Sequence, residues 1–284
     1  MDIKNIKKEF PIFKQKINGK PLVYLDSANS SQKPKVVIDK ISSFYETEYS
    51  NVGRSVHTLA VKATNRFEAT RDKIQKYLNA KHREEIIFTK GATEAINLVA
   101  SSYGKKYIKE GDEVLITELE HHSNYVPWNY LRTDKGAVIK FAKVNENGDV
   151  EIEEIKKLIT NKTKIIAITH ISNVTGAILP ITKIVDLAKE KNIPVLIDGT
   201  QGAPHSEIDM QKIGCDFYAI SCHKMYGPNG LGVLYMKKKW VDGLPRYQGG
   251  GGMINEVKKD NITFADAYTK FEAGTMQTAE VVAF

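Results

Sequence analysis

Seven short runs rich in valine, isoleucine and leucine are spaced along the chain. They occupy residues 85–89, 113–117, 137–141, 164–169, 194–198, 217–220 and 232–236. Several of these runs are almost continuously apolar, which is typical of strands that are covered on both faces. We therefore predict seven buried strands.

Helical periodicity fills the intervals between the runs. Apolar residues recur about every 3.6 positions in 96–107 and in 184–188, and residues 59–78 are predicted to form a longer helix. Alternating strands and helices predict an α/β fold with a mainly parallel seven-stranded sheet and helices on both faces. Ligands in such folds bind at the carboxyl ends of the strands, so candidate functional residues are expected there.

Composition limits the class of protein. The chain has 284 residues, of which 42% are hydrophobic and 26% charged, enough for one large domain with or without a smaller one. No apolar run approaches the ~20 residues that span a bilayer, and we expect no secretory signal. The two cysteines, Cys215 and Cys222, are too few for a disulfide framework or a cysteine-rich metal site. We expect a cytoplasmic protein without a membrane partner.

The formal charge of +7 comes from 41 basic and 34 acidic residues. Basic proteins can bind nucleic acid, but here the lysines are dispersed and often lie beside glutamates, as in 153–157. No nucleic-acid-binding motif accompanies them. We therefore expect a solvated lysine-rich surface and no nucleic-acid partner.

Two chemically active side chains follow predicted strands. Asp198 ends the predicted strand 194–198, where a carboxylate commonly caps the next turn but can also keep a ring nitrogen protonated. Lys224 follows 217–220; most lysines are solvated, whereas a lysine in a cleft can lose its proton and form a Schiff base with an aldehyde. A lysine with an acidic partner is the pattern expected for pyridoxal 5'-phosphate (PLP).

Two further segments follow earlier strands. Residues 91–94 begin a predicted helix whose free N–H groups favour an anion, although an ordinary helix cap has the same pattern. His121 and His122 are adjacent, and adjacent residues rarely reach one metal ion, which argues against zinc. An imidazole that stacks on a pyridine ring and moves protons is the better hypothesis, with two partly buried histidines as the alternative.

The order of six motifs resembles the class V aminotransferase-fold enzymes, and most closely the SUF-type cysteine desulfurases. These motifs are G-A-T-E at 91–94, E-H-H-S-N at 120–124, S-N-V-T-G at 172–176, D-G-T-Q at 198–201, S-C-H-K at 221–224 and F-E-A-G-T at 271–275. The resemblance extends over essentially the whole chain. It implies the fold of type I PLP-dependent transferases, PLP as the cofactor, and a homodimer.

The resemblance also implies a role for each matching residue. Lys224 would hold PLP and move the α-proton of the substrate, while His121 would stack on the ring and assist proton transfer. Asp198 would bind the pyridine nitrogen and Gln201 the phenolic oxygen, and Asn173 would lie beside the substrate carboxylate and the cofactor. The phosphate would be held by Ala92, Thr93, Ser221, His223 and, from the partner subunit, Thr275.

Several positions depart from the pattern of the family. Ala92 stands where many members have a second threonine, so a hydroxyl is lost while the backbone donors remain. Asn29 replaces a more usual alanine, and Cys222 a more usual small residue. Arg54 and His57 resemble positions near the cleft.

The last residues shape the expected domain organisation. Residues 278–284 are predicted to begin an apolar helix without a C-terminal signal. We expect an N-terminal segment at 1–20 that packs with a small domain, a large PLP-binding domain at 21–265, and at 266–284 the start of a connection to a C-terminal domain that is absent. The resemblance places the substrate-clamping arginine and the sulfur-accepting cysteine in that domain. Cys215 and Cys222 are poor substitutes because free cysteines are usually buried, so we expect the chain alone to be inactive.

The function implied by the resemblance is that of a cysteine desulfurase. Such an enzyme removes sulfur from L-cysteine, or selenium from L-selenocysteine, and releases L-alanine. The resulting persulfide would pass to a sulfur-acceptor protein of the SUF system for iron–sulfur cluster assembly. Two alternatives stay open: another class V PLP enzyme, such as a lyase or an epimerase, and a non-catalytic scaffold on the same fold.

Overall fold

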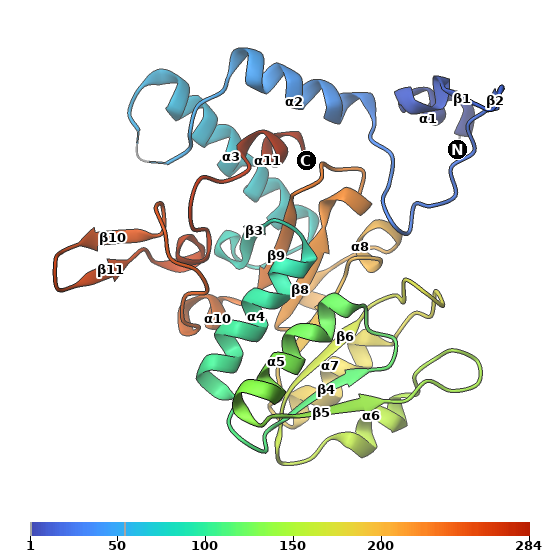
Figure 1. Ribbon diagram of the computed structural model, residues 1–284, viewed down its shortest axis with the longest axis vertical. Helices are drawn as coiled ribbons and strands as arrows, with labels where there is room; N and C mark the ends of the chain where they lie inside the picture. Colours follow the sequence, from blue (N-terminus) through green and yellow to red (C-terminus); the bar gives the residue numbers. More distant parts are fainter. Residues whose placement is uncertain (1, 54) are drawn as a thin grey trace.

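The computed structural model describes residues 2–53 and 55–284, and a seven-stranded sheet forms its centre (Figure 1). Across the sheet the order is β3 (Ile86–Thr89), β9 (Gly232–Met236), β8 (Phe217–Ser221), β7 (Val195–Asp198), β6 (Thr163–Thr169), β4 (Glu113–Thr117) and β5 (Val138–Ala142). Strand β9 runs antiparallel to both of its neighbours, and the other pairs are parallel. The predicted mainly parallel seven-stranded sheet is confirmed, and each predicted run overlaps one strand.

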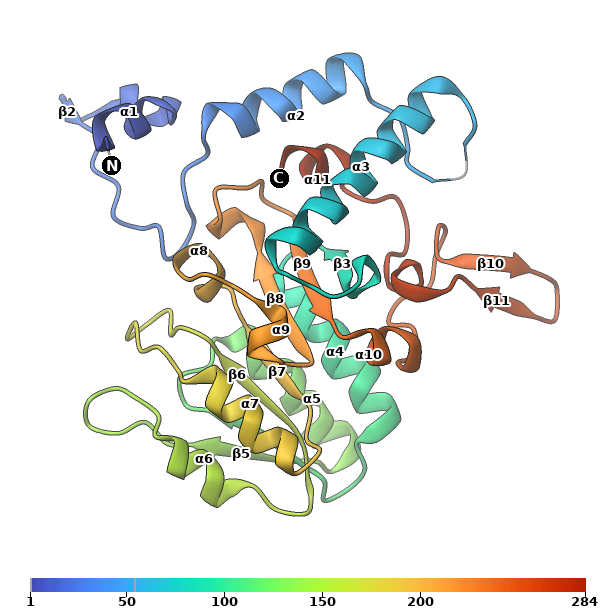
Figure 2. The same cartoon turned by 180° about the vertical axis from the view of Figure 1, so that it is seen from behind.

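Both faces of the sheet are apolar because neighbouring side chains on each strand enter different cores. On β3, Ile86 and Phe88 pack into one core and Ile87 into the other. The first core lies under α3 (Thr58–Tyr77), α6 (Ile152–Leu158), α7 (Ile181–Glu190) and α9 (Met210–Ile213). The second lies under α4 (Ala92–Tyr107), α5 (Val126–Lys135) and α10 (Lys238–Gly243). Helices α4 and α5 cover one face in Figure 1, and α7 and α9 cover the other in Figure 2.

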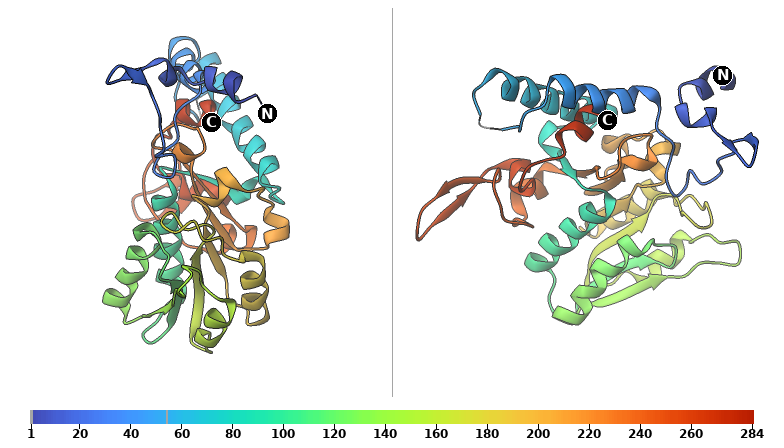
Figure 3. Two further views of the ribbon diagram at one scale, coloured as in Figure 1. Left: turned by 90° about the vertical axis from the view of Figure 1, so that its right-hand side faces the viewer. Right: turned by 45° about the horizontal axis from the view of Figure 1, so that its top comes forward.

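The remaining elements lie at the periphery. The N-terminal arm contains α1 (Ile3–Lys8), η1 (Pro11–Lys14) and the hairpin of β1 (Lys16–Ile17) and β2 (Lys20–Pro21). A second hairpin, β10 (Ile254–Val257) with β11 (Ile262–Phe264), projects on the opposite side of the molecule from the arm (Figure 3). Neither hairpin was predicted, and the predicted domain boundaries stay a prediction. Within the described residues, no helix is both long and apolar enough to cross a membrane.

Helix α2 (Lys35–Thr47) joins the arm to the body. It packs against α3 and α11 (Thr278–Ala283) through a small core of Phe44, Ala63 and Ala279. The helix predicted to begin near residue 278 is therefore present as α11, and Ala279, Val281 and Ala283 are buried.

A close backbone contact shapes one edge of the sheet. The carboxyl ends of β3, β4, β6, β7 and β8 lie at this edge, and the reversed strand β9 brings its first residue, Gly232, to the same place. A Cβ atom on Gly232 would lie 2.4 Å from Cα of Gly91. Only glycine at position 232 therefore lets the start of α4 approach the end of β8.

A buried ion pair covers the outer edge of β3. Arg71 of α3 is fully buried, and its guanidinium donates to the Glu272 carboxylate at 2.8 and 2.9 Å and to the Ile86 carbonyl at 2.7 Å. The Glu272 carboxylate also accepts the N–H of Phe88 at 2.8 Å, and the Arg71 guanidinium lies 3.8 Å from the Tyr268 ring centre. Side chains thus satisfy backbone groups that an edge strand would otherwise leave exposed.

Candidate functional site

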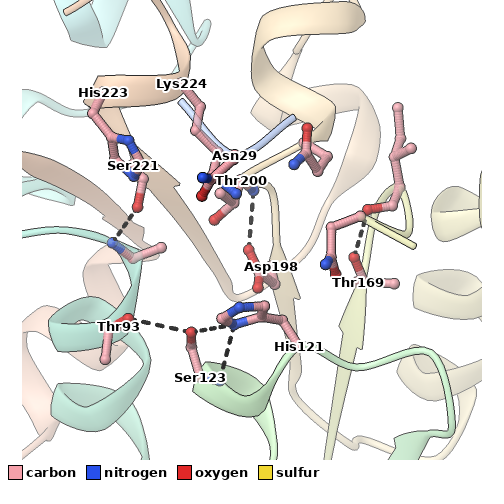
Figure 4. Close-up of a pocket in the computed structure, with 14 residues that line it drawn as sticks. Asn29, Thr93, His121, Ser123, Thr169, Asp198, Thr200, Ser221, His223 and Lys224 are labelled. Atoms are coloured by element: carbon pink, nitrogen blue, oxygen red, sulfur yellow. Dashed lines mark hydrogen bonds between the residues drawn. The ribbon is translucent and has the colours of Figure 1, made fainter. Parts of the chain in front are cut away.

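A cavity of about 210 Å³ lies at the carboxyl edge of the sheet (Figure 4). Its walls come from the segments that follow β3, β4, β6, β7 and β8, together with Asn29 of the N-terminal loop. Nine of the ten predicted site residues line it: Ala92, Thr93, His121, Asn173, Asp198, Gln201, Ser221, His223 and Lys224.

The other predicted positions lie elsewhere. Thr275 is exposed in the segment between η5 (Ala267–Phe271) and α11, and its predicted role in the site of a partner subunit stays a prediction. Arg54 lies outside the described residues. His57 caps the start of α3, where its Nδ1 accepts the N–H of Ala60 at 3.3 Å, and it is not among the residues that line the cavity.

Lys224 ends the short helix η4 (Cys222–Lys224) that follows β8. Among the described residues its Nζ has no hydrogen-bond or ion-pair partner, whereas the Asp198 carboxylate lies near enough to act on it electrostatically. Burial lowers the pKa of Lys224 below its ordinary value, and Asp198 opposes this effect. A larger fraction of Lys224 is therefore a neutral amine near neutral pH, which is the form that reacts with a carbonyl group.

The backbone before Lys224 is held by the N-terminal loop. The carbonyl of His223 accepts hydrogen bonds from Ser31 N at 3.1 Å, Ser31 Oγ at 3.0 Å and Lys33 Nζ at 2.7 Å. Ser31 Oγ also accepts the N–H of Tyr226 at 2.8 Å. These contacts fix the backbone on both sides of Lys224. They could not be predicted from local sequence patterns, because about 190 residues separate the two segments.

Asp198 ends β7, and only 5% of its surface is exposed. One carboxylate oxygen accepts the N–H of Thr200 at 3.0 Å, and the other has no partner among the described residues. The turn packs tightly behind it, because a Cβ atom on Gly199 would lie 1.9 Å from the Tyr218 ring. The site therefore presents a fixed carboxylate with one oxygen available to a protonated ring nitrogen.

The start of α4 forms the anion-binding side of the cavity. Gly91, with φ of 155°, precedes the helix, and the N–H of Ala92 donates to Ser221 Oγ at 2.9 Å. The next two backbone N–H groups, of Thr93 and Glu94, have no partner among the described residues. Two free donors at the N-terminus of a 16-residue helix, next to the Ser221 hydroxyl, can bind a phosphate.

The hydrogen bonds of His121 determine which tautomer it adopts. The N–H of Ser123 donates to Nδ1 at 3.1 Å, and Ser123 Oγ lies 2.6 Å from the same nitrogen (Figure 4). Because a backbone N–H can only donate, Nδ1 is an acceptor, and the neutral ring carries its hydrogen on Nε2. Burial lowers the pKa of His121, and Lys224 and His122 lower it further against the effect of Asp198. The site thus contains a neutral imidazole that presents an Nε2–H group.

Thr93 and Gln201 already have partners within the protein. Thr93 Oγ1 donates to Ser123 Oγ at 3.2 Å, which makes it part of the support of His121 as well as of the predicted phosphate site. Gln201 Nε2 donates to the carbonyl of Ala28 at 2.6 Å and so holds the N-terminal loop over the cavity, while its second N–H stays available.

Five lining residues were not predicted: Asn29, Ser123, Thr169, Ile171 and Thr200. Ser123 and Thr200 lie inside quoted motifs, so treating every residue of a motif as a candidate would have found them. Thr200 Oγ1 is buried without a hydrogen-bond partner among the described residues. Such a hydroxyl in a cavity wall indicates that a ligand is missing from its surroundings.

The chemistry of the cavity fits PLP. An amine without a partner, a buried carboxylate with one open oxygen, free N–H groups at a helix start and an unsatisfied hydroxyl meet in one space. These groups match the aldehyde, the pyridine nitrogen, the phosphate and a remaining polar substituent of that cofactor.

Comparison with known proteins agrees with this fit. The family model described as "Aminotransferase class-V" matches residues 23–284. A probable cysteine desulfurase of Halalkalibacterium halodurans is 47% identical over 97% of this chain and 68% of its own length. A cysteine desulfurase of Synechococcus elongatus is 43% identical over 99% of this chain and 45% of its own length.

A solved structure shows the same fold. The crystal structure of the cysteine desulfurase CsdA from Escherichia coli superimposes with a TM-score of 0.90 at 36% identity and covers 100% of this chain and 70% of that protein. The matched lengths mean that the chain spans between about half and two thirds of these relatives. The chain belongs to the class V aminotransferase family of PLP-dependent enzymes, and its relatives include cysteine desulfurases.

Proposed function

We propose that the chain provides the PLP site of a cysteine desulfurase of the SUF type. The observation that carries this proposal is the unpartnered amine of Lys224 near the buried Asp198 carboxylate, in a chain whose relatives bear that name. In the proposed reaction the Cβ–S bond of L-cysteine breaks, an S–S bond forms with an acceptor thiolate, and a proton added at Cβ gives L-alanine. L-Selenocysteine would react in the same way.

PLP, when bound, would supply an electron sink for the negative charge left when the α-proton of the substrate is removed. The neutral Lys224 amine attaches the cofactor and then takes and returns that proton. Asp198 keeps the ring nitrogen protonated, and the Nε2–H of His121 donates toward the reacting groups. The start of α4 holds the phosphate, and Gln201 and Asn173 bind the phenolic oxygen and the substrate carboxylate.

We propose that neither Cys215 nor Cys222 supplies the acceptor thiolate. Cys215 and Cys222 are both fully buried, and burial raises the pKa of each thiol well above its ordinary value. Neither forms the exposed thiolate that receives sulfur and passes it on. We therefore expect the 284-residue chain, loaded with PLP and given L-cysteine, to release no alanine, and sustained release would contradict this reasoning. The proposed acceptor is a protein of the SUF system, in the reducing cytoplasm.

The test of the proposed function is covalent capture of PLP. The chain, incubated with PLP, should turn yellow, and borohydride reduction followed by peptide mapping should place the pyridoxyl group on Lys224. Lys224→Ala should abolish the colour, whereas the matched control Lys90→Ala should keep it, because Lys90 is exposed beside the site. A wild-type chain that is colourless after excess PLP has been removed would refute the proposal.

We also propose a homodimer that completes the phosphate site. A second hollow adjoins the cavity and shares Thr93, Ser221 and His223 with it. Thr275 of the partner subunit would reach the phosphate through this opening. Mixing Lys224→Ala with Thr275→Ala chains should produce PLP binding that neither variant shows at the same concentration, because one site of each mixed dimer is intact. Equal binding by Thr275→Ala and wild type would exclude this role.

A further inference from the structure

The carboxylate of Glu120, the residue before His121, is bound by donors from three separate elements. It accepts hydrogen bonds from Thr117 Oγ1 at 2.6 Å, from Thr169 N at 2.9 Å and from Asn124 Nδ2 at 2.6 Å. Thr117 ends β4, Thr169 ends β6, and Asn124 ends η3 (His122–Asn124). The side chain therefore joins two strand ends to the turn that carries His121.

The orientation of the Asn124 amide is fixed by a further contact. Asn124 and Trp128 are both fully buried, and Asn124 Oδ1 accepts the indole N–H of Trp128 at 3.1 Å. With its oxygen occupied, the amide must turn its nitrogen toward Glu120. The resulting series of hydrogen bonds has one donor direction, from the Trp128 indole through Asn124 to the Glu120 carboxylate.

Glu120 and Asn124 flank His121 in the sequence. The N–H of Asn124 donates to the His121 carbonyl at 2.8 Å, and Ser123, directly before Asn124, donates to His121 Nδ1. A shift of Asn124 would therefore move the N–H group that fixes the tautomer of His121. Glu120 directly precedes this four-residue turn, 121–124, and Asn124 ends it, so the pair anchors the turn on both sides.

The charge of Glu120 also needs an explanation beyond stability. Glu120 is half-buried, and no cation forms an ion pair with its carboxylate among the described residues. A carboxylate that loses contact with water without gaining a cation is costly. Burial raises the pKa of Glu120 to about 8, although its three hydrogen-bond donors oppose this effect. A side chain that cannot ionise would be less costly if the position served packing alone.

We propose that Glu120 and Asn124 are a pair of positioning residues that hold His121 in the Nε2–H tautomer and aim it into the cavity. The tautomer is a property of the protein itself. The importance of the pair for catalysis rests on the proposed function.

The pair can be tested by exchanging the two functional groups. In Glu120→Gln, an amide NH₂ faces either the Asn124 NH₂ or the donors from Thr117 and Thr169. In Asn124→Asp, two carboxylates face each other. In the double variant E120Q/N124D, the Gln oxygen accepts from Thr117 and Thr169, its NH₂ donates to Asp, and the second Asp oxygen accepts from Trp128, so each donor again has one acceptor at unchanged net charge.

The main readout is the ¹⁵N spectrum of the histidine side chains in the chain without cofactor, with the His121 signals assigned by His121→Gln. Wild type should show one tautomer at His121, with hydrogen on Nε2. Each single variant should lose this pattern, and the double variant should regain it. Glu118→Gln should leave it unchanged, because within the described part of the chain the exposed Glu118 side chain accepts only the N–H of Val144. With PLP bound, Cα-proton exchange of an amino acid in D₂O should fall in the single variants by at least about tenfold and recover in the double variant. This fall is a part of the roughly 10²–10⁴-fold contribution of a proton-transfer residue, because the imidazole is misoriented and not removed.

Two outcomes would overturn the proposal: single variants with the wild-type pattern at His121, or a folded double variant that stays perturbed. If the single variants do not fold, the double variant decides alone. Circular dichroism and the melting temperature establish folding in each case. If PLP does not bind to the wild-type chain, the proposed function fails, while the spectra without cofactor still decide whether Glu120 and Asn124 position His121.

Discussion

Removal of the Arg71 guanidinium should destabilise the protein strongly. In Arg71→Met, the Glu272 carboxylate keeps the N–H of Phe88 but loses its only bidentate partner, and the Ile86 carbonyl loses a donor. Breaking one side of a buried ion pair costs about 3–5 kcal/mol, because the remaining charge stays buried without compensation. We expect a decrease of this size in the free energy of unfolding, measured by urea denaturation at pH 7.

The cost of Arg71→Met should depend on pH. Burial raises the pKa of Glu272 above its ordinary value, and Arg71 now opposes that effect, so the variant should have a still higher folded-state pKa. A folded state that binds a proton more tightly than the unfolded chain loses stability as the pH rises from the unfolded pKa, about 4.3, to the folded one. The deficit of the variant should therefore shrink when the pH is lowered from 7 to 5.

Two further variants isolate the cause. Arg66→Met removes an arginine from the same helix, but that side chain is 60% exposed and pairs with Glu48 at the surface, so we expect a loss within about 1 kcal/mol. Adding Glu272→Gln to Arg71→Met removes the uncompensated charge and should restore part of the stability. The reasoning would be refuted if Arg71→Met cost no more than Arg66→Met, or if its deficit were the same at pH 5 and pH 7.

Three other predictions follow from single contacts. Gly232→Ala should lower the free energy of unfolding by about 2–3 kcal/mol and weaken PLP binding, because its Cβ would lie 2.4 Å from Cα of Gly91. The control is Gly243→Ala, because Gly243 has open space around it. Equal thermal stability of the two variants would contradict the prediction. Ser102→Ala should raise the free energy of unfolding by about 1 kcal/mol, since the buried Oγ has no partner among the described residues, and a lower urea midpoint would refute it. The rate of borohydride-trappable PLP attachment should rise with pH and level off below 10.5, because burial lowers the pKa of Lys224; an inflection at that value would refute a buried amine.

The central sheet was predictable because its strands are covered on both faces. Continuous apolar runs such as 164–169 are rare outside that environment, and they marked all seven strands. The hairpin at 16–21 could also have been predicted, because Asn18 and Gly19, both with positive φ, are the preferred residues of a tight turn. The β10–β11 hairpin has no apolar run that could have marked it, because most of its side chains are exposed and need not be apolar.

The predicted site residues came from motifs at strand ends, and the sheet brings nine of them into one cavity. The hydrogen bonds that support these residues could not be predicted, because they join segments that are distant in the sequence. The partner of Arg71 lies 201 positions away, and the donor at Thr169 lies 49 positions from Glu120. Local sequence patterns contain no information about such pairs, which depend on the order of the strands.

The hydrogen bonds between the N-terminal loop and the His223 carbonyl have a consequence for biosynthesis. Lys33 leaves the ribosome 190 residues before its acceptor, and the anchor strand of Lys224 is among the last parts of the sheet to be made. These hydrogen bonds of the loop can therefore form only after the 190 residues between Lys33 and His223 have been made. PLP can be attached only after residue 224 has been made, so a ribosome stalled before residue 224 would release a product that cannot be loaded.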